Sequence, residues 1–390
     1  MTSDGGVPRT PHVTLKGHRG PIHVARYAKG AAKYALTAGQ DRTVRLWNAG
    51  TGAAIKTYAA HGYEVLGLAV AHDNAKFSSG GGDRSVFVWD VTSGQTIRRL
   101  SGHLARVNCV DFNADATVVA SGSFDASVRL WDLKSQSRTP IQVLDESRDA
   151  VQALVIGATS IISGSVDGHV RTYDLRMGEL RSDYMGNPVV GLALSADGQT
   201  LLVTTLDSTV RLIDMSTGKM LNSFTGHNNN DYRCRACFGH NEATVICGDE
   251  DGAVWAWDLL EAKPLAPNPP PKVHGKMITW TEHHPLETSE LLTASGDGTA
   301  IIWRGKYCCS ADHPVRGASP MLDFLSITIR LSPLLPHSLV CFANCMIPKI
   351  DIQLRCRTRE QRFQHDSLVE LYCSIAGCQE LVGEGVLQSD

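Results

Sequence analysis

Residues 121–131 read Ser-Gly-Ser-Phe-Asp-Ala-Ser-Val-Arg-Leu-Trp, and variants of this stretch recur along most of the chain. Two spacings are kept in every copy. An Asp is followed six residues later by Trp, Tyr or Ile, and is preceded four residues earlier by Ser, Thr, Val or Cys. Intervals of 42, 42, 42, 40, 44 and 46 residues separate the seven copies, which predicts a repeat architecture. The recurring residues are Asp41, Asp83, Asp125, Asp167, Asp207, Asp251 and Asp297.

Each repeat alternates short β-branched stretches with turn residues, as in Val118-Val119-Ala120 and Ser127 to Trp131. The Asp between two such stretches is typical of a hairpin, because its side chain accepts the hydrogen bonds of a tight turn. A second turn is expected five residues after the aromatic position, where Gly recurs. Four short strands in a repeat of this length predict an all-β, seven-bladed β-propeller. The second turns contain Gly52, Gly94, Gly178 and Gly218.

Four polar positions recur in the repeats: a His at the start of the blade, a Ser or Thr, the Asp and the Trp. The polar atoms of these four side chains can form one chain of hydrogen-bond donors and acceptors across a blade. We therefore expect these residues to have a structural role and not a catalytic or metal-binding one. Each His is therefore expected to pair with the Asp of its own blade. Repeats four, five and six lack part of the set and are predicted to be less rigid. The complete sets are His18, Thr37, Asp41 and Trp47; His61, Ser79, Asp83 and Trp89; His103, Ser121, Asp125 and Trp131; and His274, Thr293, Asp297 and Trp303.

The domain boundaries follow from how the ring closes. The last repeat stops after its third strand, and Val13 to His18 matches the fourth-strand endings Ile97 to His103 and Leu221 to His227. We therefore expect the N-terminal strand to complete the last blade and remove an open sheet edge. The predicted domains are a flexible N-terminus at 1–11, the propeller at 12–304, and a non-repeat tail at 305–390. The tail is expected to be disordered, or to be an extension from splicing or from a gene model.

The sequence predicts no enzyme, no cofactor and no metal site. Gly80 to Gly82 has no Walker pattern around it, and the odd spacing of Cys234 and Cys237 on a strand places them on opposite faces. The cysteines of the repeats are expected to be reduced core residues. The net charge of −3 disfavours direct nucleic-acid binding, and no segment favours a membrane span. A closed ring has few free edges, so we expect a monomer in larger complexes, cytoplasmic by default and also nuclear.

Three positions in each repeat are predicted to lie on the face where the His loops and the Asp turns emerge. They are the third and fifth residues after the His and the residue before the Asp. Exposed aromatic and aliphatic residues beside an Arg are typical of protein-binding hot spots, which favours a partner protein over a small ligand. The predicted partner-binding residues are His23, Gln40, Glu64, Leu66, Arg106, Asn108, Phe124, Tyr232, Glu250, Met277 and Thr279.

Segments between the repeat motifs point to a particular family. His61 to Leu66, Gly80 to Asp83, Leu144 to Asp149, Ser163 to Gly178 and Leu206 to Leu212 resemble the mitogen-activated protein kinase organizer family of WD-repeat propellers, WD repeat-containing protein 83. The resemblance extends over roughly residues 12–304 and is weakest at the seventh repeat. It implies a non-catalytic scaffold for MAP kinase cascade components. The family is also found with the splicing machinery, and the sequence does not choose between these two roles.

A second hypothesis belongs to a different functional class. The stretch Ile162 to Asp167, continued by Tyr173-Asp174-Leu175-Arg176, looks like the motif by which WD-repeat substrate receptors dock on the adaptor of a cullin-type ubiquitin ligase. In that hypothesis Asp174 and Arg176 belong to the docking site, and Arg176 pairs with carboxylates of the adaptor. The structural alternative is that Arg176 caps a hairpin of its blade. Direct RNA binding is a third hypothesis, which the balanced charge disfavours.

Overall fold

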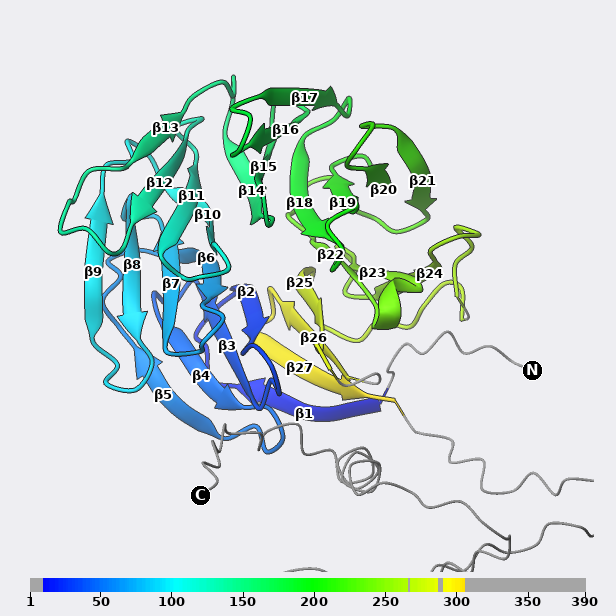
Figure 1. Ribbon diagram of the computed structural model, residues 1–390. Coiled ribbons are helices and arrows are strands. Elements are labelled where there is room, and N and C mark those ends of the chain that lie inside the picture. The colour runs from blue at the N-terminus through cyan, green and yellow to red at the C-terminus, as the bar shows by residue number, and fades with distance from the viewer. Residues whose placement is uncertain (1–9, 266, 287–289, 306–390) are drawn as a thin grey trace, which may run out of the picture. The chain divides into compact units, whose positions relative to one another are not determined.

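The computed structural model describes residues 10–265, 267–286 and 290–305, which form seven antiparallel sheets around a central axis (Figure 1). Six of these sheets have four strands and one has three. The prediction of an all-β, seven-bladed propeller is confirmed. Apart from the strands, the described residues contain one turn of 3-10 helix, His240–Glu242.

In each blade the first strand is innermost, and the innermost strands of neighbouring blades contact each other around the axis. Blades 1 to 4 consist of β2 (Ile22–Tyr27), β3 (Tyr34–Gly39), β4 (Val44–Asn48) and β5 (Ala54–Tyr58); β6 (Val65–Val70), β7 (Lys76–Gly81), β8 (Ser85–Asp90) and β9 (Thr96–Ser101); β10 (Val107–Phe112), β11 (Val118–Ser123), β12 (Val128–Asp132) and β13 (Gln142–Leu144); and β14 (Val151–Ile156), β15 (Ser160–Ser165), β16 (His169–Asp174) and β17 (Leu180–Tyr184). Blades 5 to 7 consist of β18 (Val189–Leu194), β19 (Thr200–Thr205), β20 (Thr209–Asp214) and β21 (Met220–Thr225); β22 (Ala236–Phe238), β23 (Thr244–Gly248) and β24 (Val254–Asp258); and β25 (Ile278–His283), β26 (Glu290–Ser295), β27 (Thr299–Arg304) and β1 (Thr10–Lys16).

The core lies between the faces of successive blades, where the Trp of the repeat is buried. Trp47, Trp89, Trp131 and Trp257 are among the largest fully buried side chains. One apolar cluster joins residues of blades 7, 1 and 2, including Ile302. Burying a large apolar side chain stabilises the fold by about 1.5–3 kcal/mol, so the blades stabilise one another through these contacts.

The turns that contain the recurring Asp share one backbone conformation. The residue after the Asp has a positive φ in all seven blades, although only three of these residues are Gly. The Asp side chain accepts turn N–H groups, as Asp125 does from Ser127 at 3.1 Å, and this helps hold the left-handed conformation at Ala126. The seven residues are Arg42, Arg84, Ala126, Gly168, Ser208, Gly252 and Gly298.

The N-terminal strand closes the ring, as predicted. β1 pairs antiparallel with β27, from Thr10 opposite Arg304 to Lys16 opposite Thr299. The strand starts at Thr10, two residues before the predicted boundary, so Thr10 and Pro11 belong to blade 7 and not to a flexible N-terminus. The predicted tail, apart from Gly305, lies outside the described residues.

Blade 6 differs from the four-strand prediction, because the described residues after β24 form no fourth strand. Proline lacks the N–H that a regular ladder needs, and Pro264 to Pro271 contains five prolines. Among the described residues, isolated bridges join Trp257 of β24 to Pro264, and Ala253, just before β24, to Lys272, just after the segment. The Leu265 N–H also donates to the Ala256 carbonyl at 2.8 Å.

Candidate interaction surface

The predicted polar chain is present in blades 1, 2, 3 and 7. In blade 2, the Trp89 indole donates to the Ser79 hydroxyl oxygen at 2.8 Å, this oxygen lies 2.7 Å from His61 Nε2, and His61 Nδ1 lies 2.8 Å from Asp83. Blades 1, 3 and 7 repeat these contacts at 2.7–3.3 Å. An indole only donates, so the hydroxyl accepts from Trp, donates to Nε2, and leaves Nδ1–H to donate to the carboxylate.

Electrostatics agree with this assignment. Burial lowers the pKa of His18 and His274 despite the neighbouring carboxylates, so both imidazoles are neutral near neutral pH. Burial raises the pKa of Asp41, but its interactions with His18 and the hydrogen bonds from Thr43 and Arg19 together outweigh burial, and the net pKa lies below the ordinary value. These residues connect strands within a blade. Their geometry supports a structural use.

In blades 4 and 5, which lack the His, the Asp pairs with the Arg four residues after it. Arg171 donates to both carboxylate oxygens of Asp167 at 3.2 and 2.7 Å, and Arg211 does the same with Asp207 at 3.3 and 2.6 Å. In blade 5 the hydroxyl and Trp positions are the apolar Val203 and Ile213, so no buried polar group there requires the missing His.

Blade 6 contradicts the expectation that every His pairs with the Asp of its own blade. His227 is buried, and neither ring nitrogen has a hydrogen-bond partner among the described residues. Asp251 is exposed and pairs instead with Lys272 at 3.1 Å. The cause is Cys247, which occupies the hydroxyl position, because a thiol is a weak hydrogen-bonding group. The Trp257 indole donates to the Thr225 carbonyl at 3.0 Å instead.

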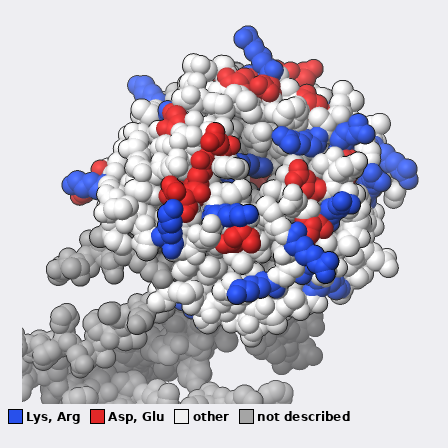
Figure 2. Space-filling model, turned by 180° about the vertical axis from the view of Figure 1, so that it is seen from behind, with Lys and Arg blue, Asp and Glu red and all other residues white. Residues whose placement is uncertain are grey.

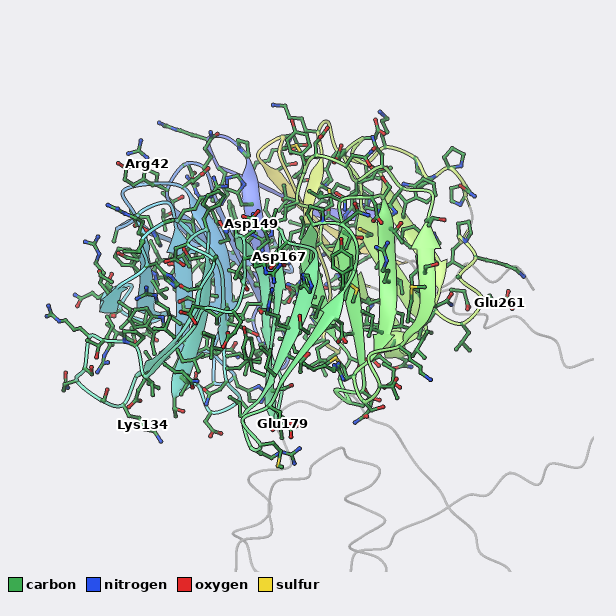
Figure 3. The ribbon with its side chains drawn as sticks, turned by 90° about the horizontal axis from the view of Figure 1, so that it is seen from above. Arg42, Lys134, Asp149, Asp167, Glu179 and Glu261 are labelled. Atoms are coloured by element: carbon green, nitrogen blue, oxygen red, sulfur yellow. The ribbon has the colours of Figure 1, made fainter. Side chains whose placement is uncertain are left out.

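The turns that contain the recurring Asp define one face of the disc, which we call the Asp-turn face. In a side view, Arg42 of such a turn lies at one edge of the disc, and Lys134 and Glu179, from turns between third and fourth strands, lie at the opposite edge (Figure 3). Of the residues predicted for the Asp-turn face, Gln40, Arg106, Phe124 and Tyr232 are exposed. His23, Glu64, Leu66, Glu250 and Met277 are partly buried.

Two predicted surface residues are buried, which corrects the sequence interpretation. Asn108 and Thr279 are 2% and 8% exposed. The Asn108 amide donates to the Val151 carbonyl at 2.9 Å, and the Thr279 hydroxyl donates to the Ile22 carbonyl at 2.7 Å. In both cases the acceptor is the first residue of the innermost strand of the next blade. These side chains connect neighbouring blades and are not available to a partner.

The physical reason is a register shift that recurs at the start of the innermost strand. The fifth residue after the His is the one that the ladder skips in blades 1, 2, 3 and 7. A bulge of this kind redirects a side chain, here towards the next blade. In blade 1 the skipped residue is His23, whose Nε2 lies 3.3 Å from a carboxylate oxygen of Glu64 in blade 2.

The third residue after the His and the residue before the Asp contact each other in blade 3, whereas in blade 6 the residue before the Asp orders a loop. Arg106 lies on the face of the Phe124 ring, with 4.8 Å from the guanidinium carbon to the ring centre. Glu250 accepts the backbone N–H groups of Asn230, Asp231 and Tyr232 at 2.6–2.9 Å, so this carboxylate orders the loop that carries Tyr232.

The sequence interpretation missed two exposed apolar residues on the same face. Tyr63 is 64% exposed and Leu104 is 78% exposed. Tyr63 packs beside Gly82 in blade 2, and the Leu104 N–H donates to Asp125 at 2.8 Å in blade 3. They follow His61 and His103 by two residues and one residue, so the first two positions after each His would have revealed them.

The proposed adaptor-docking residues lie on the opposite side, in the turn after β16. The Arg176 side chain is 69% exposed and lies 3.7 Å from the Asp174 carboxylate. Asp174 accepts the backbone N–H groups of Arg176 and Met177 at 2.7 and 3.1 Å. The Asp174 carboxylate therefore shapes the turn, while most of the Arg176 guanidinium faces solvent.

Within the described ranges, no group of three or more His, Cys, Asp or Glu could hold a metal ion, and no helix is long and apolar enough to cross a membrane. Cys109, Cys234, Cys237 and Cys247 are free and buried, as expected for reduced core residues. Figure 2 shows one face of the molecule, on which basic and acidic side chains are interspersed.

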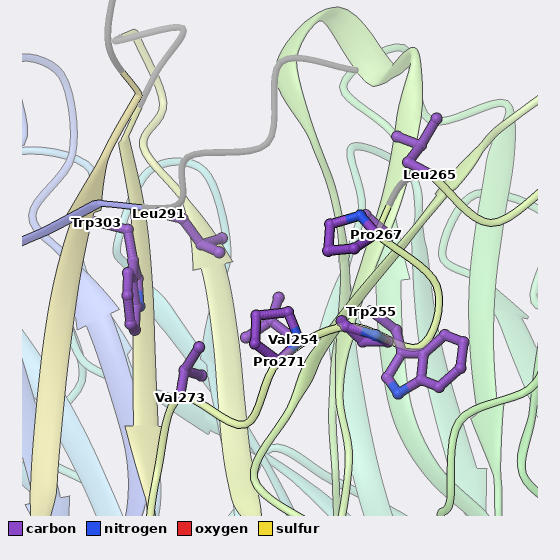
Figure 4. A pocket seen from close by; sticks show the side chains of 10 residues that line it. Val254, Trp255, Leu265, Pro267, Pro271, Val273, Leu291 and Trp303 are labelled. Carbon is purple, nitrogen blue, oxygen red and sulfur yellow. The ribbon is translucent and has the colours of Figure 1, made fainter. Parts of the chain in front are cut away.

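An apolar cavity of about 60 Å³ lies between blades 6 and 7, where the described residues of blade 6 form no fourth strand. Trp255 and Pro267 line one part of it, and Trp303 and Leu291 line another, with Val254 and Pro271 in between (Figure 4). The proline-rich segment therefore covers the side of β24 less completely than a paired strand would.

Comparisons with known proteins identify the repeat and the family. Residues 9–48, 52–90 and 94–132 match the WD domain, G-beta repeat family, and residues 179–283 match the anaphase-promoting complex subunit 4 WD40 domain. Human WD repeat domain-containing protein 83 is 50% identical over 303 residues, which cover 76% of this chain and 94% of that protein. The chain belongs to the WD repeat domain-containing protein 83 family. The Danio rerio member of the family is 52% identical over 290 residues, which cover 74% of this chain and 90% of that protein. A Schizosaccharomyces pombe protein, uncharacterized WD repeat-containing protein C713.05, is 52% identical over 239 residues, or 61% of this chain and 80% of its own.

Membership in the WD repeat domain-containing protein 83 family, together with the propeller, supports a protein-interaction scaffold. A closed ring of blades presents rigid loops at fixed positions around an axis, and such loops can hold partner proteins.

Proposed function

We propose that the protein is a scaffold that gathers components of a MAP kinase cascade on the Asp-turn face of its propeller. The observation that carries the proposal is the set of exposed apolar side chains on that face, with Phe124 at 49%, Tyr232 at 50% and Tyr63 at 64% exposure. Large aromatic residues of this kind dominate the binding energy of protein interfaces. The resemblance of the inter-motif segments to the MAP kinase organizer family supports the choice of partner.

Arg106 and Phe124 are the centre of the proposed contact. The guanidinium already lies on the ring before any partner binds, so little side-chain entropy remains to be lost on binding. A partner that covered this pair and the neighbouring Leu104 would bury apolar surface and could place a carboxylate against Arg106.

The test is affinity purification from native cells followed by mass spectrometry. The Asp-turn variant carries Arg106→Glu, Phe124→Ala and Tyr232→Ala. A matched control, Lys134→Glu with Met177→Ala and Leu260→Ala, makes the same kinds of change in the turns that follow third strands. Circular dichroism first establishes that both variants are folded. Kinase-cascade proteins should copurify with wild type and the control, and be lost from the Asp-turn variant. Equal recovery with all three proteins contradicts the proposal.

The same purification tests the splicing role and the compartment. We propose that the protein works in the cytoplasm and also in the nucleus, and that any RNA it meets is bound by its partners. The protein is purified from separated cytoplasmic and nuclear fractions, each with and without ribonuclease. Splicing factors should be recovered from the nuclear fraction whether or not ribonuclease is present. Filter binding of the purified protein to RNA at low salt should give no steep salt dependence, since such a slope marks direct phosphate contacts.

A second candidate function is that of a substrate receptor of a cullin-type ubiquitin ligase. The exposed side chain of Arg176 favours it, because a guanidinium that lies largely in solvent can pair with carboxylates of an adaptor. Arg176→Ala should then lose the adaptor in a pull-down, with Arg138→Ala as the control for an exposed Arg on a neighbouring blade. Undiminished recovery of the adaptor by Arg176→Ala excludes this function for the motif.

A further inference from the structure

Three arginine side chains converge at the centre of the propeller. A partly open cavity of about 20 Å³ lies there, and residues of all seven blades line it. Arg26 comes from blade 1, and Arg233 and Arg235 come from the segment that leads into β22 of blade 6. No Asp or Glu is among the lining residues. A volume of this size holds about one water-sized group.

Backbone carbonyls of other blades fix the three guanidinium groups through Nε. Arg26 Nε donates to the Leu68 carbonyl at 3.4 Å, and Arg235 Nε donates to the Leu192 carbonyl at 3.1 Å. Arg233 Nε donates to the Val190 carbonyl at 3.3 Å. Each acceptor lies on an innermost strand, β6 or β18, whose inner edge has no further strand to pair with. The guanidinium groups are therefore held in place by the inner edges of these two strands.

Most of the terminal N–H donors remain available. A guanidinium has five N–H donors. Arg233 uses one terminal nitrogen, Nη1, to reach the Asn108 carbonyl of blade 3 at 2.9 Å, and Arg26 Nη1 lies 3.6 Å from Glu282. For Arg235 no acceptor of a terminal nitrogen is found in the parts of the chain that the structure describes. The unused donors belong to the groups that line the cavity.

Trp280 keeps two of these groups in position. The guanidinium carbons of Arg235 and Arg26 lie 4.3 and 4.9 Å from the centre of the Trp280 ring. The Trp280 indole is fixed by donating to Glu282 at 3.2 Å. Gly67 and Gly191 also line the cavity and place no side chain in it.

The charges at the axis are unbalanced. The two carboxylates that act on Arg235 are Glu282, which already pairs with Arg26, and Asp111, which accepts the Ile156 N–H at 2.9 Å. Three cations therefore face two carboxylates that already have partners. Burial, and then repulsion by Arg26, lowers the pKa of Arg235 to about 9, so that this group is still charged at neutral pH.

We propose that the guanidinium groups of Arg26, Arg233 and Arg235 bind a small oxyanion of the phosphate or sulfate class at the propeller axis. Arginine suits this ligand because its planar donor fork matches the oxygens of such an anion. The cavity accepts one oxygen between the guanidinium groups, and the rest of the anion lies towards the open side. The anion is either a free ion or the phosphate of a phosphorylated side chain.

The experiment is a thermal-unfolding titration of the full chain with inorganic phosphate, at constant ionic strength maintained with sodium chloride. Phosphoserine is titrated in parallel. A ligand that binds only the folded state raises Tm with its concentration. We expect a saturable rise in wild type, and apparent affinity weaker by at least about tenfold in Arg235→Gln, because a charge-assisted hydrogen bond is lost. The control is Arg148→Gln, which removes the same charge from an exposed position and should leave the rise unchanged.

A rise of equal size in Arg235→Gln, or no rise beyond that given by chloride, overturns the proposal and leaves the three arginines as purely structural caps of the inner strand edges. Should Arg235→Gln fail to fold, Arg26→Gln and Arg235→Lys take its place, since Lys keeps the charge and loses the fork. Broadening of the phosphate ³¹P resonance by wild-type protein gives a readout without unfolding. Tighter binding of phosphoserine than of phosphate assigns the anion to a partner protein, and the reverse assigns it to a free ion.

Discussion

The imidazole of His227 lies edge-on against the indole of Trp257, with 5.3 Å between ring centres, while both of its nitrogens lack hydrogen-bond partners among the described residues. In blade 2 the corresponding His61 connects Ser79 to Asp83. The contrast follows from one substitution, Cys247 at the hydroxyl position, and from Asp251 turning to Lys272. His227 is therefore a buried base whose neutral form alone is compatible with its surroundings.

This environment predicts an acid sensitivity that belongs to His227. Burial lowers its pKa to about 4, against the ordinary value of 6.5. The unfolded chain then binds the proton more readily than the folded chain, so stability is complete above pH 6.5 and falls as the pH drops towards 4. The shift corresponds to about 3 kcal/mol. His227→Phe keeps the ring contact and removes the titration.

The measurement is the free energy of unfolding by urea between pH 7 and pH 4. The wild-type curve should fall more steeply than that of His227→Phe, by about 3 kcal/mol over this range. Carboxylates whose pKa is lowered, such as Asp41, stop contributing to the free energy of unfolding only when the pH falls below the ordinary carboxyl pKa of 3.8. They therefore do not affect the difference between the two curves. Parallel curves would show that His227 has a partner or reaches solvent.

The hydroxyl of Ser79 is the central atom of the blade 2 network, and Ser78 offers a matched control on the same strand. Ser79→Ala leaves both the Trp89 indole and His61 Nε2 buried without a partner, which should cost about 2–3 kcal/mol of unfolding free energy. The Ser78 hydroxyl is also buried but has no partner within the described part of the chain, so Ser78→Ala should change stability by less than about 0.5 kcal/mol. Denaturant midpoints of the two variants would be compared with wild type. Similar losses in both would mean that volume, not hydrogen bonding, decides.

Fixed offsets explain why the blade networks could be predicted from sequence. The Asp, the hydroxyl residue and the Trp keep their spacings, so each of them occupies the same position of the strand ladder in blade after blade. Trp47, Trp89 and Trp131, for example, each lie opposite the residue two before the hydroxyl residue of their own blade. The residues of the Asp-turn face were harder to predict, because a fixed number of residues after the His does not show where the strand has a bulge. Asn108 and Thr279 are skipped by the ladder, and their side chains bind the next blade. The described residues of blade 6 form no fourth strand because prolines cannot complete a ladder, although the repeat spacing alone predicts one.

The arginines that pair with the Asp in blades 4 and 5 were not distinguishable from the sequence, because blades 1 and 3 also have an Arg four residues after the Asp. The two arginines differ in burial. The Arg171 side chain is 5% exposed and that of Arg211 is 18% exposed. Arg171→Met leaves the Asp167 carboxylate partly buried without its cation and should cost about 3 kcal/mol. Arg211→Met should cost less, about 1 kcal/mol, because water screens the Asp207 carboxylate more effectively. Chemical denaturation checks the order of the two variants, and the reverse order would contradict the role of burial.

The closing strand β1 makes the stability of the whole ring depend on one N-terminal residue. Leu15 is fully buried in the cluster that joins blades 7, 1 and 2, whereas Thr14 beside it is exposed on the same strand. Leu15→Ala should lower the free energy of unfolding by about 3 kcal/mol through the cavity it leaves, and Thr14→Ala by less than about 0.5 kcal/mol. If β1 detaches in Leu15→Ala, the edge of β27 is exposed, and the variant should also associate through that edge. Light scattering with hydrogen exchange of the β27 amides measures both effects. Unchanged exchange at Ile301 and Ile302, together with wild-type stability, would mean that the ring closes without the contribution of Leu15.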